Sequence, residues 1–172
     1  MVRPTLKKQI PNLQEAIKET AWKQIAETGA ATLSLRSIAR ELGITAPAIY
    51  NYHPDRDALV TALIVDAYIS LGESQQAAID ALPTDDQKAR LSALGLAYRE
   101  WAITYPQRYL LIFGTPIPNY VAPENITMPA AACAIVPLTN TLQALYSSKK
   151  LKLERLSPLL SLIHISEPTR PY

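Results

Sequence analysis

The sequence predicts an all-α protein built from two helical parts. Apolar residues recur every three or four positions along both halves, which is the period of an amphipathic helix. Glycines, prolines and residues able to cap helices separate these stretches. No strand signal and no internal repeat interrupts the first half. We therefore expect a short arm over residues 1–10, a small helical domain over 10–70 and a second helical bundle over 71–159.

Capping residues and glycines set the limits of the first two helices. Asn12 followed by Glu15 resembles a capping box, and Gly29 supplies the stop of the first helix. Ser34 is placed to cap a second helix, which Gly43 ends. The apolar residues at helical spacing are Ile17, Ala21 and Ile25 in the first helix and Leu35, Ile38, Ala39 and Leu42 in the second.

The third helix is short because a glycine precedes it and a proline follows it. Thr45 is placed to cap it, and Pro47 is tolerated in a first turn. Pro54 forces the helix to finish by Tyr52 or His53, because the residue before a proline avoids the helical conformation. A fourth, longer helix follows, with a capping aspartate at Asp55 and with Leu59, Leu63, Ile64, Ala67 and Leu71 along one side.

The outward face of the third helix has the size and the chemistry of a DNA-reading element. At about 1.5 Å per residue, residues 45–52 span roughly 12 Å, which matches the width of the major groove. At 100° per residue, Ile49 and Tyr52 face the preceding helix, and the opposite face carries Ala46, Pro47, Tyr50 and Asn51. The Asn51 amide can bond an adenine edge, and the Tyr50 hydroxyl can donate to a phosphate. Two helices joined by a tight glycine turn, with this division of faces, predict a helix-turn-helix.

Other residues near this face are open to a plainer interpretation. Arg36 and Arg40 of the second helix and Arg56 at the start of the fourth add positive charge, but by default such arginines are solvated. A short helix between a glycine and a proline also serves as a mere connector in a helical bundle. The net charge of +2, from 17 basic and 15 acidic residues, permits nucleic-acid binding without arguing for it.

The remaining composition restricts the compartment and the chemistry. A single cysteine, Cys133, excludes an internal disulfide, so a reducing compartment suffices. The start, MVRPTLKKQIPN, lacks the apolar segment of a secretory signal, and no apolar run reaches the roughly 18 residues that span a bilayer. We expect a soluble cytoplasmic protein without a membrane partner.

No catalytic set is evident in the sequence. The chain has two histidines, no glycine-rich phosphate loop and no Cys/His cluster with metal-ligand spacing. Asp85 and Asp86 are adjacent in a turn and face different directions, so they make no acid–base pair. We therefore expect no enzymatic activity, no metal and no cofactor.

The second half also has a helical pattern. The turn PTDD at 83–86 can cap a helix that Pro106 ends, and Pro106 starts the stretch PQRYLLIFG. The stretch TPIPNYVAPENITMP, with four prolines and little periodicity, is predicted to be a loop, followed by a helix over about Met128 to Ser147. The residues at helical spacing before Pro106 are Leu91, Leu94, Tyr98, Trp101 and Tyr105.

The stretch GAATLSLRSIARELGITAPAIYNYHPDRDALV closely resembles the DNA-binding domain of the TetR/AcrR family of bacterial regulators. The resemblance covers about residues 10–70 and implies a three-helix, homeodomain-like helix-turn-helix domain. It implies that Ser34, Tyr50 and Arg56 hold phosphates and that the outward positions of the third helix read bases. The chain departs from the family at two positions. Family members often have His where this chain has Tyr52, and they usually have Phe where it has His53. We expect His53 to be a half-buried ring packed against the first and fourth helices. The predicted DNA contacts are Ser34, Arg36, Thr45, Ala46, Tyr50, Asn51 and Arg56.

The stretch YREWAITYPQRYLLIFGTPIPNYVAP resembles the ligand-binding domain called WHG in a subset of TetR-like regulators. An aromatic stripe of this kind is usually core, but in such a domain it can also wall a cavity for a small apolar ligand. The predicted ligand contacts are Tyr98, Trp101, Tyr109, Phe113 and Tyr120.

The C-terminal residues bear on assembly. The resemblance implies dimerisation through two C-terminal helices, and the segment KKLKLERLSPL would only begin that surface. Residues 160–172, LSLIHISEPTRPY, resemble the in-frame translation of a sequencing-library adapter, so we expect a truncated gene and a non-native tail.

We therefore expect a ligand-responsive repressor that binds a palindromic operator as a homodimer. A small apolar ligand in the C-terminal domain would tilt the two DNA-binding heads and so couple the two sites. Two hypotheses compete with this one: a helical sensor or adaptor that does not bind DNA, and a small helical enzyme that acts on an apolar substrate.

Overall fold

The computed structural model describes residues 10–148, and all regular structure in that range is helical. The all-α prediction is therefore confirmed for the part of the chain that is described. The adapter-like tail at 160–172 and the segment KKLKLERLSPL lie outside the described residues. The elements are α1 (Leu13–Thr28), the 3₁₀ turn η1 (Ala30–Thr32), α2 (Leu35–Leu42), α3 (Ala46–Tyr50), α4 (Arg56–Asp80), α5 (Gln87–Thr104), α6 (Pro106–Phe113) and α7 (Glu124–Ser147).

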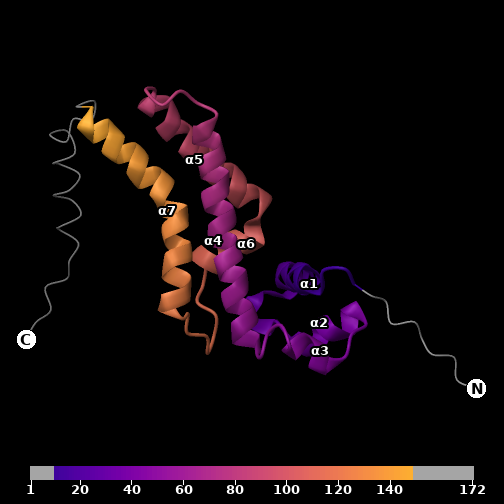
Figure 1. Ribbon diagram of the computed structural model, residues 1–172. Helices are drawn as coiled ribbons and strands as arrows, with labels where there is room; N and C mark the ends of the chain where they lie inside the picture. The colour runs from indigo at the N-terminus through magenta and orange to yellow at the C-terminus, as the bar shows by residue number, and fades with distance from the viewer. Residues whose placement is uncertain (1–9, 149–172) are drawn as a thin grey trace, which may run out of the picture.

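The long helix α4 connects the two parts of the molecule (Figure 1). Helices α1, α2 and α3 gather at its N-terminal end, and α5, α6 and α7 flank the remainder. Because α4 continues without a break through residues 70 and 71, it belongs to both parts and connects them. The predicted domain limit at residue 70 falls inside this helix and stays a proposal.

Most of the predicted caps are present. Asn12, Ser34 and Asp55 each accept a hydrogen bond from the backbone amide three residues further on, at 3.3, 3.4 and 2.7 Å. Asp86 of the PTDD turn does the same for α5, at 3.0 Å. Each such cap stabilises a helix by about 1 kcal/mol. Thr45 occupies the N-cap position of α3, but its side chain makes no capping bond.

The core of the N-terminal part forms where the predicted apolar stripes meet. Ile17 of α1, Ile38 of α2 and Ile49 of α3 are fully buried. They pack with Leu59 and Leu63 from the first turns of α4. Burying each such side chain is worth about 1.5–3 kcal/mol, and together they fix how α3 is held against α1 and α4.

Helices α4 and α7 cross closely because both present small groups at the contact. A Cβ atom added to Gly72 would lie 2.6 Å from the carbonyl oxygen of Cys133. That carbonyl is free of its usual partner because Pro137, four residues on, has no N–H to donate. One turn away along α4, the buried Gln75 donates from Nε2 to the carbonyl of Ala134 at 2.9 Å.

Helix α7 corrects two expectations. It begins at Glu124 and not near Met128, so the predicted loop over 115–129 is helical in its last part. Pro129 and Pro137 lie inside the helix, although proline usually ends one. The tertiary contact overrides the proline signal, because a stripe of mostly small side chains packs α7 against α4 and α5: Thr127, Ala130, Ala134, Pro137, Thr141 and Leu145 are buried.

The expectation that no segment could span a bilayer also needs correction. Within residues 10–148, α7 is long enough and, with a mean hydropathy of 1.2 over its best window, apolar enough to do so by length and composition. Core helices of soluble proteins pass the same test but are mostly buried, whereas 28% of this window is buried. A single helix of this kind is weak evidence for a membrane span.

Candidate nucleic-acid interface

A tight turn joins α2 to α3. Gly43 ends α2 with a φ of 67°, a left-handed conformation that glycine adopts without a steric penalty. Its amide donates to the carbonyl of Arg40 at 3.2 Å, and the next amide, of Ile44, donates to Ala39 at 3.0 Å. Carbonyls in the last turn of α2 thus accept hydrogen bonds from the amides of the turn. The turn leads the chain directly into α3, as in a helix-turn-helix.

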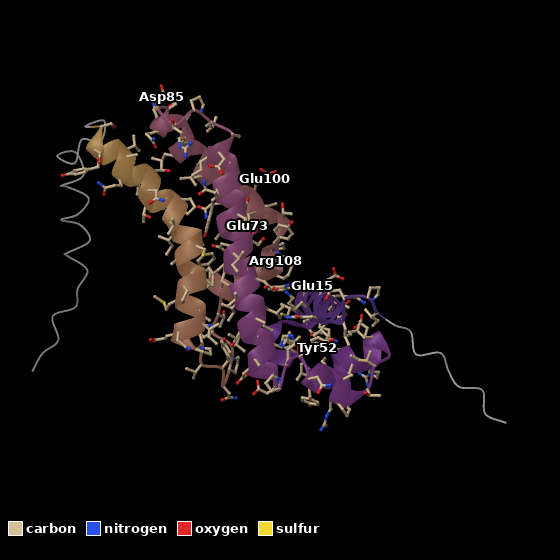
Figure 2. All side chains as sticks on the ribbon, viewed as in Figure 1. Glu15, Tyr52, Glu73, Asp85, Glu100 and Arg108 are labelled. Atoms are coloured by element: carbon tan, nitrogen blue, oxygen red, sulfur yellow. The ribbon has the colours of Figure 1, made fainter. Side chains whose placement is uncertain are left out.

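Helix α3 is shorter than the spacing predicted, and this changes the place of one residue. It ends at Tyr50, and the amides of both Tyr52 and His53 donate to the carbonyl of Ile49. Because Tyr52 lies beyond the helix, the 100° step no longer applies to it. The prediction that Tyr52 faces α2 is wrong: its side chain is 45% exposed at the end of α3 (Figure 2).

The outward face of α3 otherwise has the expected residues. Ala46, Pro47 and Asn51 are exposed, and Tyr50 is 41% exposed, whereas Ile49 is fully buried beneath them. Thr45, at the start of the helix, is exposed as well. The face therefore offers small side chains that allow close approach, with an amide and a phenol beside them.

Four of the predicted DNA contacts surround one hollow at the N-terminus of α2. Ser34, Arg36, Tyr50 and Arg56 line this depression of about 330 Å³, which we call the α2 hollow. The first amides of a helix lack intrahelical acceptors, and the helix dipole makes this end favourable for an anion. Three separate segments of the chain thus converge on the hollow, which two arginines and the α4-capping carboxylate of Asp55 line together.

Arg56 is more constrained than the sequence suggested. Its Nη2 donates to the carbonyls of Ala30 and Ala31 in η1, at 3.0 and 3.2 Å, and its Nη1 lies 3.3 Å from an oxygen of Asp57. The guanidinium therefore ties η1 to the start of α4 at the edge of the hollow. Arg36, by contrast, is exposed and forms no ion pair with another residue of the described range.

His53 is more buried than expected. Its side chain is only 5% exposed, and no hydrogen-bond partner within the described range reaches its Nε2. Burial, and to a smaller degree the positive charge of Lys18, lowers the pKa of His53 below its ordinary value of 6.5, while Asp66 opposes this shift. Burial thus favours the neutral form of the ring where α3 leads into α4.

The five predicted ligand contacts do not surround one cavity. Tyr98, Tyr109 and Phe113 contact one another, with ring centroids 5.2–6.3 Å apart. Trp101 is 3% exposed, packs in a small core with Leu71, and donates from its indole nitrogen to Ser70 Oγ at 3.0 Å. These contacts are what ordinary packing would produce, and a role in binding a ligand stays a prediction for all four.

Tyr120 is the member of the set that lines a described cavity. Its hydroxyl lies 2.9 Å from Thr61 Oγ1 of α4. The cavity, of about 330 Å³, lies among α4, α6, the loop before α7 and the first turns of α7; we call it the bundle cavity. Sequence reasoning missed Tyr68 of α4, which also lines it and whose helical spacing from buried Ile64 was the available signal.

A polar groove runs along the opposite side of α4. Glu15 of α1 and Arg108 of α6 both line it (Figure 2). The Arg108 guanidinium stacks over the rings of Tyr105 and Trp22, with its carbon 4.5 and 5.4 Å from their centroids. These contacts tie α6 to α1 across the junction of the two parts, so the position of α6 is linked to that of the helix-turn-helix.

Comparison with known proteins gives matches along most of the chain. Residues 17–63 match the family described as bacterial regulatory proteins of the tetR family. Residues 91–164 match the family described as the tetracyclin repressor-like C-terminal domain. The two matches fall on either side of the middle of α4.

Curated relatives and solved structures agree with these families. The HTH-type transcriptional regulator Rv1816 of Mycobacterium tuberculosis is 41% identical over 115 residues, which are 67% of this chain and 49% of that protein. A counterpart in Mycobacterium bovis, Mb1846, matches equally well. The chain thus spans about half the length of the curated relatives it matches.

The solved structures include the regulatory protein SCO4313, which is 43% identical, with a TM-score of 0.69, over 77% of this chain and 62% of that one. A protein from Rhodococcus sp. RHA1 is similar in fold alone, with a TM-score of 0.70 at 22% identity over 86% of this chain and 73% of that one.

Proposed function

The chain belongs to the TetR family of bacterial regulatory proteins, and on that premise we propose that it is a transcriptional regulator that binds operator DNA through α2 and α3. The curated relatives are named as transcriptional regulators, which supports a regulatory and not an enzymatic role. A soluble, cytoplasmic location follows from this proposal, because the DNA is in that compartment.

The α2 hollow is the observation that carries the proposal. Ser34 and Tyr50 bring two hydroxyls to the exposed N-terminus of α2, and Arg36 and Arg56 bring two guanidinium groups. With a phosphate in this hollow, the outward face of α3, with Asn51, would lie along the base edges of the adjoining major groove. Phosphate contacts would then set the position and α3 would read the sequence.

We propose that the regulator is a repressor that a small apolar ligand releases from DNA. The bundle cavity, of about 330 Å³, supports this, since its size lies at the lower end of the range for small-molecule sites. Its walls come mainly from apolar residues, and the polar side chains among them are those of Tyr68, Thr115, Tyr120 and Thr127. A ligand there would push α6 and α7 against α4, which continues into the helix-turn-helix. The C-terminal part, over 71–159, would be the ligand-binding domain, of the WHG type.

We also propose a homodimer on a palindromic operator. The outer face of α7 supports it: Met128, Ile135, Leu142 and Tyr146 are exposed and fall on one side of the helix. Such a continuous apolar stripe is typical of a surface that another helix or a second copy covers. Two copies would each present one α3 to a half-site.

A gel-shift with promoter DNA next to the parent gene tests the proposal. We expect a shift with this DNA, and a weaker one with a scrambled sequence of equal length. Arg36→Ala should weaken the binding, whereas Arg99→Ala, which removes an exposed arginine of α5, should leave it unchanged. If the promoter and the scrambled DNA bind equally, or neither binds, then a helical sensor or adaptor without DNA binding becomes the better account.

A further inference from the structure

A second cavity lies at the junction of the two parts of the molecule. It measures about 580 Å³ and is bounded on one side by the end of α1 and by η1, and on the other by α6 and the loop that follows it. We call it the junction cavity. The loop residues Thr115, Pro116 and Ile117 separate it from the bundle cavity and contribute to the walls of both.

The walls of the junction cavity define the chemistry of an occupant. Ile25 and Ala26 of α1 face Leu110 and Leu111 of α6, and among the described residues no charged side chain lines the cavity. The polar side chains that line it within residues 10–148 are Gln107 and Thr115. A volume of this size lies within the range for small-molecule sites, which are mainly apolar with a few polar groups. An uncharged molecule with one or two hydrogen-bonding groups fits these walls, whereas an ion would lose its hydration without gaining a partner.

The junction cavity is connected to the α2 hollow through a short path. Ala30 and Ala31 of η1 line the cavity, and their carbonyls accept both hydrogen bonds from Arg56 Nη2. Arg56 also lines the α2 hollow, beside Tyr50. A molecule between η1 and α6 would therefore contact η1 directly, and any shift of η1 would move the two carbonyls that hold the guanidinium in place. One turn of 3₁₀ helix separates the two sites.

We propose that the junction cavity binds an uncharged, mainly apolar small molecule, and that its occupancy weakens DNA binding by displacing the η1 carbonyls that position Arg56. The binding of the molecule is independent of the proposed function, whereas the effect on DNA rests on it. The site is distinct from the bundle cavity, so two ligands could act on one regulator. Since coupling between two sites is reciprocal, DNA would lower the affinity for the molecule by the same factor.

The uncharged naphthalene ketone prodan, whose emission shifts to the blue in apolar surroundings, serves as the probe. Titration of the 172-residue chain should give a saturable blue shift. Ala26→Phe, at an exposed position of α1 that lines only the junction cavity, should abolish it. Ala122→Phe, at an exposed position that lines only the bundle cavity, is the matched control and should leave it unchanged. Circular dichroism of each variant confirms that it folds.

The effect on DNA is measured by anisotropy of labelled promoter DNA with and without saturating prodan. Prodan should weaken binding about 5-fold or more, within the usual range of coupling between sites. Arg56→Lys keeps the charge but cannot bridge two carbonyls in the same way. The DNA affinity of this variant should therefore be nearly the same with and without prodan.

The outcomes separate the two proposals. If prodan does not bind, or if Ala122→Phe abolishes its binding and Ala26→Phe does not, the junction site is overturned. Loss in neither variant would place the probe elsewhere, on the exposed apolar surface, and would overturn it too. Binding that Ala26→Phe abolishes, in a chain that binds no DNA, would support the site and contradict the proposed function. Binding at the site with no change in DNA affinity would overturn the coupling.

Discussion

Replacing Gly72 by alanine tests the close crossing of α4 and α7. The added Cβ would lie 2.6 Å from the carbonyl oxygen of Cys133 and 2.9 Å from its carbon. Both atoms belong to the backbone of α7, so no flexible side chain can move aside. Helix α7 would have to shift, and the hydrogen bond from Gln75 to Ala134, at 2.9 Å, would lengthen with it.

A matched substitution isolates the cost of that shift. Gly95 lies inside α5, and an added Cβ there meets nothing within 4 Å. Both substitutions gain the same helix propensity, about 0.5–1 kcal/mol for alanine over glycine. The difference between the two variants therefore reports the clash, which overpacking of this kind places at about 1–3 kcal/mol.

Urea unfolding followed by circular dichroism measures both variants against the parent chain. We expect Gly95→Ala to be more stable than the parent and Gly72→Ala to be less stable than Gly95→Ala by about 1–3 kcal/mol, with an unchanged dependence on urea. Equal stability of the two variants would refute the close crossing of α4 and α7.

Three further predictions concern single side chains. Tyr50→Phe should weaken DNA binding by about 1–2 kcal/mol in a gel-shift, through one lost charge-assisted phosphate bond, at unchanged melting temperature. Removal of another exposed hydroxyl, by Thr104→Ala in α5, should have no effect, and an equal loss there would contradict the assignment. Because the pKa of His53 is lowered in the folded state, the unfolded state takes up a proton first as the pH falls through about 6.5. The melting temperature should therefore drop between pH 7 and 5, and His53→Phe should make that drop smaller. An equally steep drop in the variant would assign the pH dependence to other groups. Trp101→Ala should lower the free energy of unfolding, measured with urea, by about 3–5 kcal/mol, as expected for a core position. A small loss of stability with a selective loss of ligand binding would instead support Trp101 as a ligand contact.

Local signals predicted most of the fold. The caps at Asn12, Ser34 and Asp55 and the glycine turn at Gly43 involve residues within a few positions of one another, so short-range rules suffice for them. The start of α7 was missed because its stability comes from packing on α4, more than 50 residues earlier, as the Gln75 to Ala134 bond shows. Tertiary contact outweighed the proline signal there.

The cavities and the tie at Arg56 could not be predicted for the same reason. The junction cavity joins the end of α1 to α6 and its loop, which only the packing of the two parts brings together. The bonds from Arg56 to Ala30 and Ala31 span 26 and 25 residues. An aromatic stripe such as that of Tyr98 and Trp101 has helical spacing whether it walls a cavity or fills a core, so periodicity alone cannot separate the two.

The most direct test of the proposed DNA reading is the base preference at Asn51. Affinities of the parent chain and of Asn51→Ala are measured by fluorescence anisotropy against a bound promoter fragment and its single-base-pair variants. If α3 lies in the major groove, changing one particular base pair should cost the parent chain about 1–3 kcal/mol of binding free energy. The same change should cost Asn51→Ala nothing, whereas changes at the other base pairs should affect both proteins in the same order. An equal loss of affinity on all sequences in Asn51→Ala would contradict the reading of bases by α3.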